Sequence, residues 1–417
     1  MRPTGRIRLG RLATLVVLAA CGAAAMVGGC SCEAPEVRHL AMAEGIPAIR
    51  VKLGDDGPRL ALAVDGPYRL TADGRPVGAV GSLPWTAVEA APGGFRLQGR
   101  TVAAKALELH PLSGGGTFRL RTKAGGADRE RSYRGWLRVG RTADGRLRPV
   151  NVVSAEAYVA GVLANELVPR WHLETHKAQA VAARTFAMAE RLRRAADDFD
   201  VFDSAQSQVY GGADTETATA WEAVAATRGV VAVYAGPDGR PTLLKTYYHS
   251  TCGGATCAAA VAFGGSTPPP LRGVTCPYCR ASRLFEWKDV EITKREMTEA
   301  LRRSGAPALA TLQDITHLEV AQADPNGRAI AVRVVDTTGR SLRIAAGEWR
   351  LMVGPRRLPS TWFTVRDAGD RFLLDGHGWG HGVGLCQWGA QYLAERGLTG
   401  EQILRFYYPG VELTRAY

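Results

Sequence analysis

The chain has 417 residues, of which 46% are hydrophobic and 22% are charged. This length suffices for two or three domains, and the composition is that of a globular protein, which excludes a chain that is disordered throughout. The formal net charge is +12, and a basic protein suits an anionic partner such as a nucleic acid, a membrane or a cell wall.

Residues 1–29 predict an export signal. A basic stretch, "MRPTGRIRLGR", precedes the apolar run "LATLVVLAACGAAAMVGG". Two cysteines follow small residues, as at the cleavage site of a bacterial lipoprotein: Cys30 after "VGG" and Cys21 after "LAA". We expect lipidation at Cys30, because cleavage at Cys21 would leave "GAAAMVGG" at the mature end. An ordinary signal peptide and an uncleaved membrane anchor are the alternatives.

Removal of this signal, which contains four arginines and no acid, lowers the net charge from +12 to +8. No later stretch is apolar over enough residues to span a bilayer. We therefore expect an exported protein of the cell envelope or periplasm, tethered to the membrane by its lipid. Nucleic acid is not an expected partner, because the sequence contains no motif for it and an exported chain rarely meets it.

Residues 30–45 are predicted to be a tether, and a small β-rich domain is predicted over residues 46–146. Short runs such as "RLALAV", "TFRLRT" and "GWLRVG" alternate apolar and polar residues there. Turn sequences such as "DDGP", "ADGR" and "SGGG" separate these runs. Such alternation between turns is typical of antiparallel strands.

Residues 147–417 mix helical and strand patterns. A long helix is predicted from about Leu173 to Arg194, where apolar residues recur every three or four positions. A second helix ends at Gly229, a hairpin follows it, and "HLEVAQADPNGRAIAVRVVDTTGRSLRIA" predicts a β-meander. A glycine-rich run leads into a final helix. The whole chain is predicted to be α+β, with antiparallel sheet dominant.

Glu166 stands in the apolar run "GVLANELVP". Burial of a carboxyl raises its pKa, because desolvation disfavours the charged form. A carboxyl that is protonated near neutral pH can act as a general acid. The alternative is that Glu166 has only a structural role, at a helix end or as a hydrogen-bonded carboxylate in the core.

The run "GHGWGHGVGLCQWGAQ" has glycine at every second position from Gly376 to Gly384. In a strand this spacing would leave one face open to backbone or ligand, and His377, Trp379 and His381 would share the other face. A tight loop with packed histidines is the alternative.

Four cysteines form the pattern C-x4-C-x18-C-x2-C, namely Cys252, Cys257, Cys276 and Cys279. With His249 nearby, this pattern suits a structural tetrahedral Zn²⁺ site. In an oxidising compartment the same four residues could form two disulfides instead. Cys386 is expected to be a lone, buried and inert thiol.

Several separated motifs resemble the SpoIID/LytB family and stand in that family's order. They are "ANELVP" with "KAQAVAARTF", then "DSAQSQVYGG", "TRGVVAVY", "YYHSTCGG" and "GHGWGHGVGLCQWGAQ". The resemblance runs from about residue 147 to 414. It implies an antiparallel-sheet-rich catalytic domain with a few helices over residues 147–417, preceded by the small β-rich domain.

The resemblance implies cleavage of peptidoglycan glycan strands that have lost their stem peptides. The bond cut is the β-1,4 bond between N-acetylmuramic acid (MurNAc) and N-acetylglucosamine (GlcNAc), and the product is 1,6-anhydroMurNAc. Glu166 would be the single catalytic residue, acting as acid and then as base, because the C6 hydroxyl of MurNAc is an internal nucleophile. No cofactor is required. The alternative is a non-catalytic wall-binding protein that enhances an N-acetylmuramoyl-L-alanine amidase, although the intact "ANELVP" favours the enzyme.

The resemblance also implies substrate contacts. Arg184, with Lys177 as a weaker candidate, would bind lactyl carboxylates or acetamido groups. Tyr210 and Trp379 would stack on sugar rings or pack in the core. The remaining candidates are His249, which would orient substrate or bind metal, His381 and Gln387. The family usually has Ser or a similar residue at the position of Cys386. A relative within the family binds zinc through His and Cys residues, with another spacing of the ligands.

Overall fold

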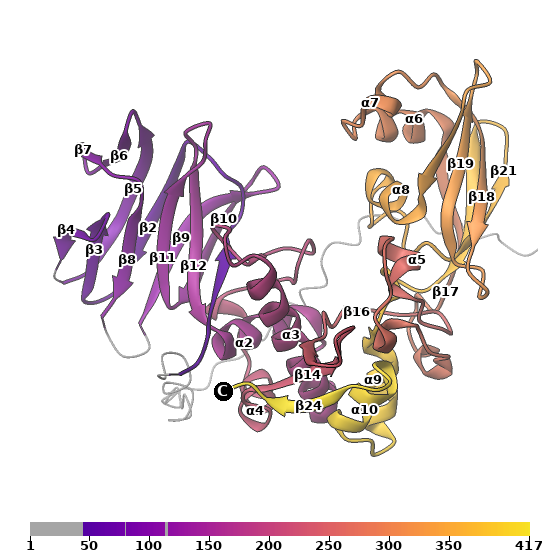
Figure 1. Ribbon diagram of the computed structural model, residues 1–417. Coiled ribbons are helices and arrows are strands. Elements are labelled where there is room, and N and C mark those ends of the chain that lie inside the picture. Colours follow the sequence, from indigo (N-terminus) through magenta and orange to yellow (C-terminus); the bar gives the residue numbers. More distant parts are fainter. Residues whose placement is uncertain (1–44, 80, 113–115) are drawn as a thin grey trace, which may run out of the picture. The chain divides into compact units, whose positions relative to one another are not determined.

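The computed structural model describes residues 45–79, 81–112 and 116–417. The predicted export signal, Cys21, Cys30 and nearly all of the predicted tether lie outside these ranges. Within them, no helix combines the length and the apolar character needed to cross a bilayer. Helices and mainly antiparallel sheets make up the described chain, which confirms the predicted α+β class (Figure 1).

The N-terminal part contains two sheets, and the predicted succession of short strands is confirmed. One sheet has the order β13-β1-β12-β11-β8-β3-β4 and the other the order β10-β9-β2-β5-β6-β7. The first consists of β1 (Ala48–Lys52), β3 (Tyr68–Ala72), β4 (Arg75–Ala79), β8 (Leu107–Pro111), β11 (Trp136–Arg141), β12 (Leu147–Ser154) and β13 (Val201–Phe202). The second consists of β2 (Arg59–Val64), β5 (Leu83–Ala91), β6 (Gly94–Leu97), β7 (Arg100–Ala103), β9 (Thr117–Ala124) and β10 (Ala127–Arg134).

Strand β9 illustrates how alternation builds this part. Phe118 and Leu120 are buried in the shared core, because successive side chains of a strand point to opposite faces. Arg119 and Arg121 therefore lie on the other face, where their guanidinium groups sit 5.0 and 3.9 Å from the ring centre of Trp85.

Three helices pack onto the same core: α2 (Ala155–Glu166), α3 (Leu173–Arg193) and α4 (Ala218–Ala226). Strand β12 runs directly into α2, whose first turn is capped by Ser154 through a 3.3 Å hydrogen bond from the amide of Ala157. One buried cluster contains residues of both N-terminal sheets and of these helices. The predicted domain boundary at 146/147 thus falls within a continuous core, at the start of a strand that belongs to the first sheet.

The C-terminal elements surround a second core. They are β14 (Val230–Ala235), β15 (Pro241–Leu243), β16 (Tyr248–His249), α5 (Ala259–Phe263), β23 (Leu385–Cys386), α9 (Gln387–Glu395), α10 (Gly400–Tyr407) and β24 (Glu412–Arg415). Strands β14 and β15 form the predicted hairpin, and β24 pairs with the other edge of β14. Strands β16 and β23 pair in parallel, with Tyr248 opposite Leu385 and His249 opposite Cys386.

A further part, inserted between β16 and β23, has its own core around Trp349 and Phe372. One of its sheets contains β17 (Glu286–Thr293), β22 (Arg371–His377) and β21 (Phe363–Asp367). The other is the predicted meander of β18 (Ile315–Ala323), β19 (Ala329–Asp336) and β20 (Ser341–Ala345). The accompanying helices are α6 (Lys294–Arg302), α7 (Pro307–Ala310) and α8 (Ala346–Val353).

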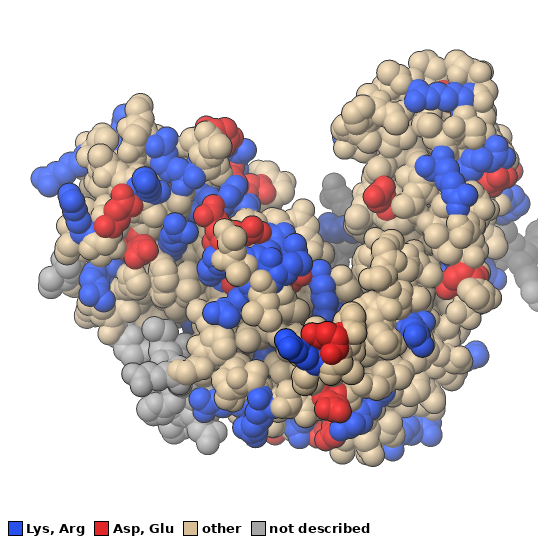
Figure 2. Space-filling view, in the orientation of Figure 1, with Lys and Arg blue, Asp and Glu red and all other residues tan. Residues whose placement is uncertain are grey.

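On the face that Figure 2 displays, the positive charge is spread out and does not form a single patch. Lys and Arg side chains are spread over that face, with Asp and Glu among them. Several arginines of the described residues have carboxylate partners, such as Arg148 with Asp56 at 2.7 Å and Arg121 with Glu130 at 2.6 Å. Much of the basic surface is therefore locally offset.

One ion pair of the core is completely buried. Arg184 Nη2 lies 2.6 Å from Glu156 Oε2, and neither side chain is exposed. The other oxygen of Glu156 accepts hydrogen bonds from the Gly229 amide (2.9 Å) and the Tyr417 hydroxyl (2.8 Å). This pair joins α2 to α3 and to the strand region that follows α4.

We expect Arg184→Ala to lower the free energy of unfolding by about 3–5 kcal/mol, because the substitution leaves a buried carboxylate without its cation. Lys177→Ala on the same helix is the matched control, since its pair with Glu174 is partly exposed and should contribute about 0–1 kcal/mol. Urea denaturation followed by circular dichroism measures both. Equal losses in the two variants would contradict the structural role of Arg184.

Candidate active site

Glu166 is the last residue of α2, and the chain leaves the helix at the extended Leu167. The carboxylate Oε1 accepts a 2.9 Å hydrogen bond from the backbone amide of Val209, and the side chain is half-buried. Its place at the C-terminal end of a helix also matters, because the partial negative charge there disfavours a second negative charge.

Burial is the strongest influence on Glu166 and raises the pKa of its carboxyl above the ordinary value near 4.5. The Val209 amide, the Gln387 side chain and the Tyr248 hydroxyl lower the pKa, but by less than burial raises it. Glu166 takes part in none of the ion pairs found in the described ranges. The carboxyl therefore keeps its proton to a higher pH than an exposed glutamate does.

Tyr248 is a member of the site that the sequence analysis missed. Its hydroxyl lies beside Glu166 and accepts a 2.9 Å hydrogen bond from Nε2 of the buried Gln208. The Gln208 oxygen in turn accepts a 3.0 Å hydrogen bond from the Tyr158 hydroxyl. These hydrogen bonds hold the Tyr248 hydroxyl in place. In the sequence, Tyr248 stands directly before His249 in "YYHS".

Gln387, the first residue of α9, lies near Glu166. It is buried and close enough to the Glu166 carboxylate to lower its pKa. Within the described structure its Nε2 nevertheless has no hydrogen bond of normal geometry. The Gln387 side chain is therefore a buried polar group next to the Glu166 carboxyl.

Arg184 and Tyr210 do not fit the substrate contacts expected of them. Arg184 is sealed in its pair with Glu156. Tyr210 is 1% exposed, donates a 3.0 Å hydrogen bond to Asn151 Oδ1, and packs against the ring of Tyr158. Both residues support the core, because α3 and the 203–212 segment are covered on the sides that carry them.

His249 and His381 lie together, with ring centres 5.5 Å apart. Nδ1 of His249 is 3.1 Å from the carbonyl oxygen of Val383, and Nδ1 of His381 accepts a 3.0 Å hydrogen bond from the Val383 amide. Burial lowers the pKa of both rings, that of His249 to about 3. Both are neutral hydrogen-bonding groups, and no hydrogen bond of the described residues joins either ring to Glu166.

Two half-buried tryptophans, close to Glu166 and Gln387 in the sequence, form an aromatic pair. The rings of Trp171 and Trp388 meet edge to face, with centres 5.1 Å apart. Trp171 follows Glu166 by five residues, and Trp388 directly follows Gln387. Partly exposed aromatic faces of this kind suit an apolar sugar face. Trp379, the expected stacking residue, is half-buried elsewhere in the glycine-rich segment.

Two small cavities lie elsewhere on the described surface. One of about 270 Å³ is lined by Trp85, Glu89 and Arg96 among others. Another of about 190 Å³ is lined by residues of the inserted part, including Trp287 and Trp362. Glu166 lines neither cavity. The candidate active site is therefore identified from the side chains around Glu166 and not from a cavity.

The glycine-rich segment is not the single strand that the alternation predicted. Strand β22 ends at His377, and φ is between +70° and +110° at Gly378, Gly380, Gly382 and Gly384. Glycine adopts such angles without steric cost. A Cβ on Gly384 would lie 2.1 Å from the carbonyl oxygen of Tyr247. The glycines thus permit close packing against the residue next to Tyr248, and the histidines between them do not share the face of one regular strand.

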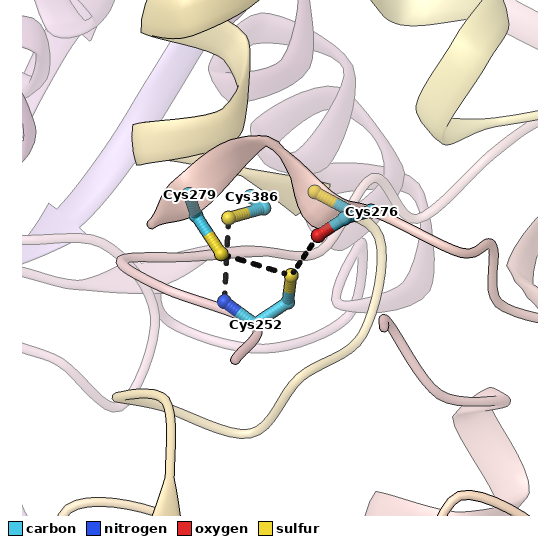
Figure 3. Close-up of side chains that lie close together, drawn as sticks. All are labelled: Cys252, Cys276, Cys279 and Cys386. Atoms are coloured by element: carbon cyan, nitrogen blue, oxygen red, sulfur yellow. Dashed lines mark hydrogen bonds between the residues drawn. The ribbon is translucent and has the colours of Figure 1, made fainter. Parts of the chain in front are cut away.

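The structure changes the membership of the cysteine group. Cys252, Cys276 and Cys279 converge with Cys386, and Cys257 is not among them (Figure 3). The four sulfur atoms are buried and lie within 4.8 Å of one another. Cys257 instead contacts the carbonyl oxygen of His381 at 3.5 Å. The expectation that Cys386 is a lone thiol is therefore corrected.

The fold and the site define an α+β protein in which Glu166 is an acid outside the described ion pairs with a raised pKa, and comparisons identify its family. Residues 143–234 match the SpoIID family, described as Stage II sporulation protein, and residues 278–384 match DUF8618, a domain of unknown function. An uncharacterized protein of Brachyspira hyodysenteriae is 35% identical over 265 residues, which cover 63% of this chain and 67% of that protein. The chain belongs to the SpoIID/LytB family.

Two relatives from Bacillus subtilis are also similar. Stage II sporulation protein D is 28% identical, with 64% of this chain and 76% of that protein covered. The amidase enhancer is 29% identical, with 61% of this chain but only 40% of that protein covered. The SpoIID match spans α2, α3 and α4, and the DUF8618 match spans most of the inserted part.

We expect Glu166→Gln to gain stability relative to wild type as the pH rises. Because the folded-state pKa of Glu166 is raised, the folded protein binds this proton more tightly than the unfolded chain does. Wild type therefore loses stability as the pH rises from near 4.5 through the raised folded pKa, whereas Gln does not titrate. Urea denaturation at a series of pH values measures the difference.

Glu174→Gln on α3 is the matched control, with the opposite sign. Burial acts to raise the pKa of Glu174, but the hydrogen bonds from Lys177 and the Gly400 amide lower it overall. This control variant should therefore lose stability relative to wild type as the pH rises. If both variants gained stability relative to wild type as the pH rises, or both lost it, the result would contradict the raised pKa of Glu166.

Proposed function

We propose that this chain is an exported lytic transglycosylase that acts on the glycan strands of peptidoglycan. It cuts the β-1,4 bond between MurNAc and GlcNAc and leaves a 1,6-anhydroMurNAc end. The observation that carries the proposal is Glu166, a carboxyl with a raised pKa that lies among hydrogen-bond donors and outside the described ion pairs. Membership of the SpoIID/LytB family and the resemblance of "ANELVP" support it.

The first chemical step is protonation of the leaving group. Glu166 gives its proton to the glycosidic oxygen while the bond from that oxygen to C1 of MurNAc breaks, and GlcNAc departs as an alcohol. The raised pKa favours the protonated starting state over the ionised state that predominates for an exposed glutamate near neutral pH.

The second step restores the acid. The C6 hydroxyl oxygen of the same MurNAc bonds to C1, and its proton passes to the Glu166 carboxylate. The nucleophile belongs to the substrate, so the reaction consumes no water and needs no second carboxylate of the kind that a hydrolase uses. The single acid of the site is then sufficient.

The groups around Glu166 have distinct parts in this scheme. The Val209 amide and the Tyr248 hydroxyl stabilise the carboxylate between the two steps, and they also orient it. The Gln387 side chain, which also lowers the pKa of Glu166, helps to orient the carboxyl. Trp171 and Trp388 provide faces for a sugar ring.

The proposal extends to location. The basic, apolar N-terminus supports export, with a lipid on Cys30, or on Cys21 as the second choice. A net charge of +8 without the signal suits an anionic wall.

The similarity to an amidase enhancer favours a second candidate function. In that case the chain would bind the wall without cutting it and would stimulate an N-acetylmuramoyl-L-alanine amidase. Glu166 would then have no chemical part, and its raised pKa would have only a cost in stability.

We expect Glu166→Gln to slow the formation of anhydro ends by at least about 100-fold, because it removes the general acid and base but keeps the shape of the side chain. The assay uses purified protein with glycan strands freed of stem peptides, followed by mass analysis of the strand ends. Glu174→Gln, a carboxyl-to-amide change on α3, is the control and should retain wild-type activity.

Three outcomes would overturn parts of the proposal. Activity that survives Glu166→Gln removes this residue from the chemistry. Reducing ends instead of anhydro ends would show that water, and not the C6 hydroxyl, is the nucleophile. Wild type that forms no anhydro ends but stimulates a purified amidase would establish the second candidate.

A further inference from the structure

The buried cysteine group unites three segments that are far apart in the chain. Cys252 follows β16, Cys276 and Cys279 lie at the short 3-10 helix η3 (Pro277–Cys279), and Cys386 is the last residue of β23. Figure 3 shows their sulfur atoms gathered around a common centre. All four side chains are buried, in the core that also contains Leu385 and Tyr407.

The spacing of the sulfur atoms fits one tetrahedral ion. Four thiolates about 2.3 Å from a zinc ion lie about 3.8 Å from one another. Here all four lie within 4.8 Å, and Cys252 and Cys279 are 3.4 Å apart. A disulfide would require about 2.05 Å. A cluster of several iron ions would hold its cysteine sulfurs further apart.

The surroundings also suit thiolate ligands. The Cys252 amide donates to the sulfur of Cys386 (3.3 Å), the Gly254 amide donates to the sulfur of Cys252 (3.5 Å), and the Tyr407 hydroxyl lies 3.1 Å from the sulfur of Cys276. Hydrogen bonds to the ligand atoms are a regular feature of metal sites in proteins.

A buried cation stands next to the group. Arg328 is 1% exposed and donates a 3.0 Å hydrogen bond to the carbonyl oxygen of Cys252. It takes part in no ion pair among the described residues, and its Nη1 has no hydrogen-bond partner there. A zinc ion with four thiolates has a net charge of −2, which would offset this buried guanidinium.

We infer that Cys252, Cys276, Cys279 and Cys386 together bind one structural Zn²⁺ ion. Four protein ligands leave no open position, so the ion has no part in catalysis. It ties together both ends of the inserted part, because Cys276 and Cys279 stand at the start of residues 278–384 and Cys386 follows their end. It also fixes the start of α9, where Gln387 directly follows a ligand.

Metal analysis of the full-length chain, purified without chelator, tests this inference independently of any activity. We expect one zinc ion per chain. Cys386→Ala should weaken zinc binding by more than about 100-fold, since even loss of a group that only supports a ligand costs 10- to 100-fold. Competition with a chromophoric chelator measures that affinity. Cys257→Ala is the matched control, because it removes an equally buried thiol outside the group and should keep the zinc.

Cobalt substitution gives a second readout. Co²⁺ in wild type and in Cys257→Ala should show the visible absorption of a tetrahedral ion together with thiolate charge transfer, and both should be lost in Cys386→Ala. If Cys386→Ala fails to fold, the metal content and the cobalt spectrum of wild type still test whether the cysteine group binds zinc. Wild type without metal and with disulfide-linked peptides among the four cysteines would overturn the inference. One equivalent of iron would overturn the choice of zinc, and loss of zinc from Cys257→Ala alone would overturn the ligand set.

Discussion

The candidate activity depends on one desolvated carboxyl, that of Glu166. Helix α2 is apolar on nearly all sides, so it lies within the core and delivers its last residue into a setting that disfavours charge. A cation within reach would reverse this effect. The neighbouring helix α3 does bring a guanidinium to α2, but Arg184 is bound by Glu156. One helix thus holds one carboxylate in a buried ion pair, that of Glu156, and another, that of Glu166, which takes part in none of the ion pairs of the described residues.

The groups around Glu166 come from distant segments, so their arrangement depends on how the helices pack. Gln387 begins α9, and α9 is fastened to α3 through Gln391, whose Oε1 accepts hydrogen bonds of 2.9 Å from both the His172 amide and the Thr175 hydroxyl. Tyr248 is placed by the parallel pairing of β16 with β23. Both residues are therefore held by contacts at a distance from the carboxyl itself.

The inserted part enters and leaves the fold close to these same elements. It has its own core, and its ends return to the pairing of β16 with β23 and to the cysteine group. A site that joined four cysteines there would make the geometry beside Glu166 insensitive to movements of the insertion.

Local patterns in the sequence were enough for the α+β class, the long helix after Leu173, the hairpin and the meander, because apolar periodicity acts within each element. They also singled out Glu166, whose apolar neighbours are adjacent in the chain, and the family motifs pointed to Gln387. The burial of Arg184 did not follow, because the position of a residue on a predicted helix does not say what covers that residue. The sequence also did not indicate that Cys386, and not Cys257, belongs to the cysteine group. It did not indicate that Tyr248 lies beside Glu166. Sequence spacing measures distance along the chain, and only the pairing of β16 with β23 brings residues about 130 positions apart into contact.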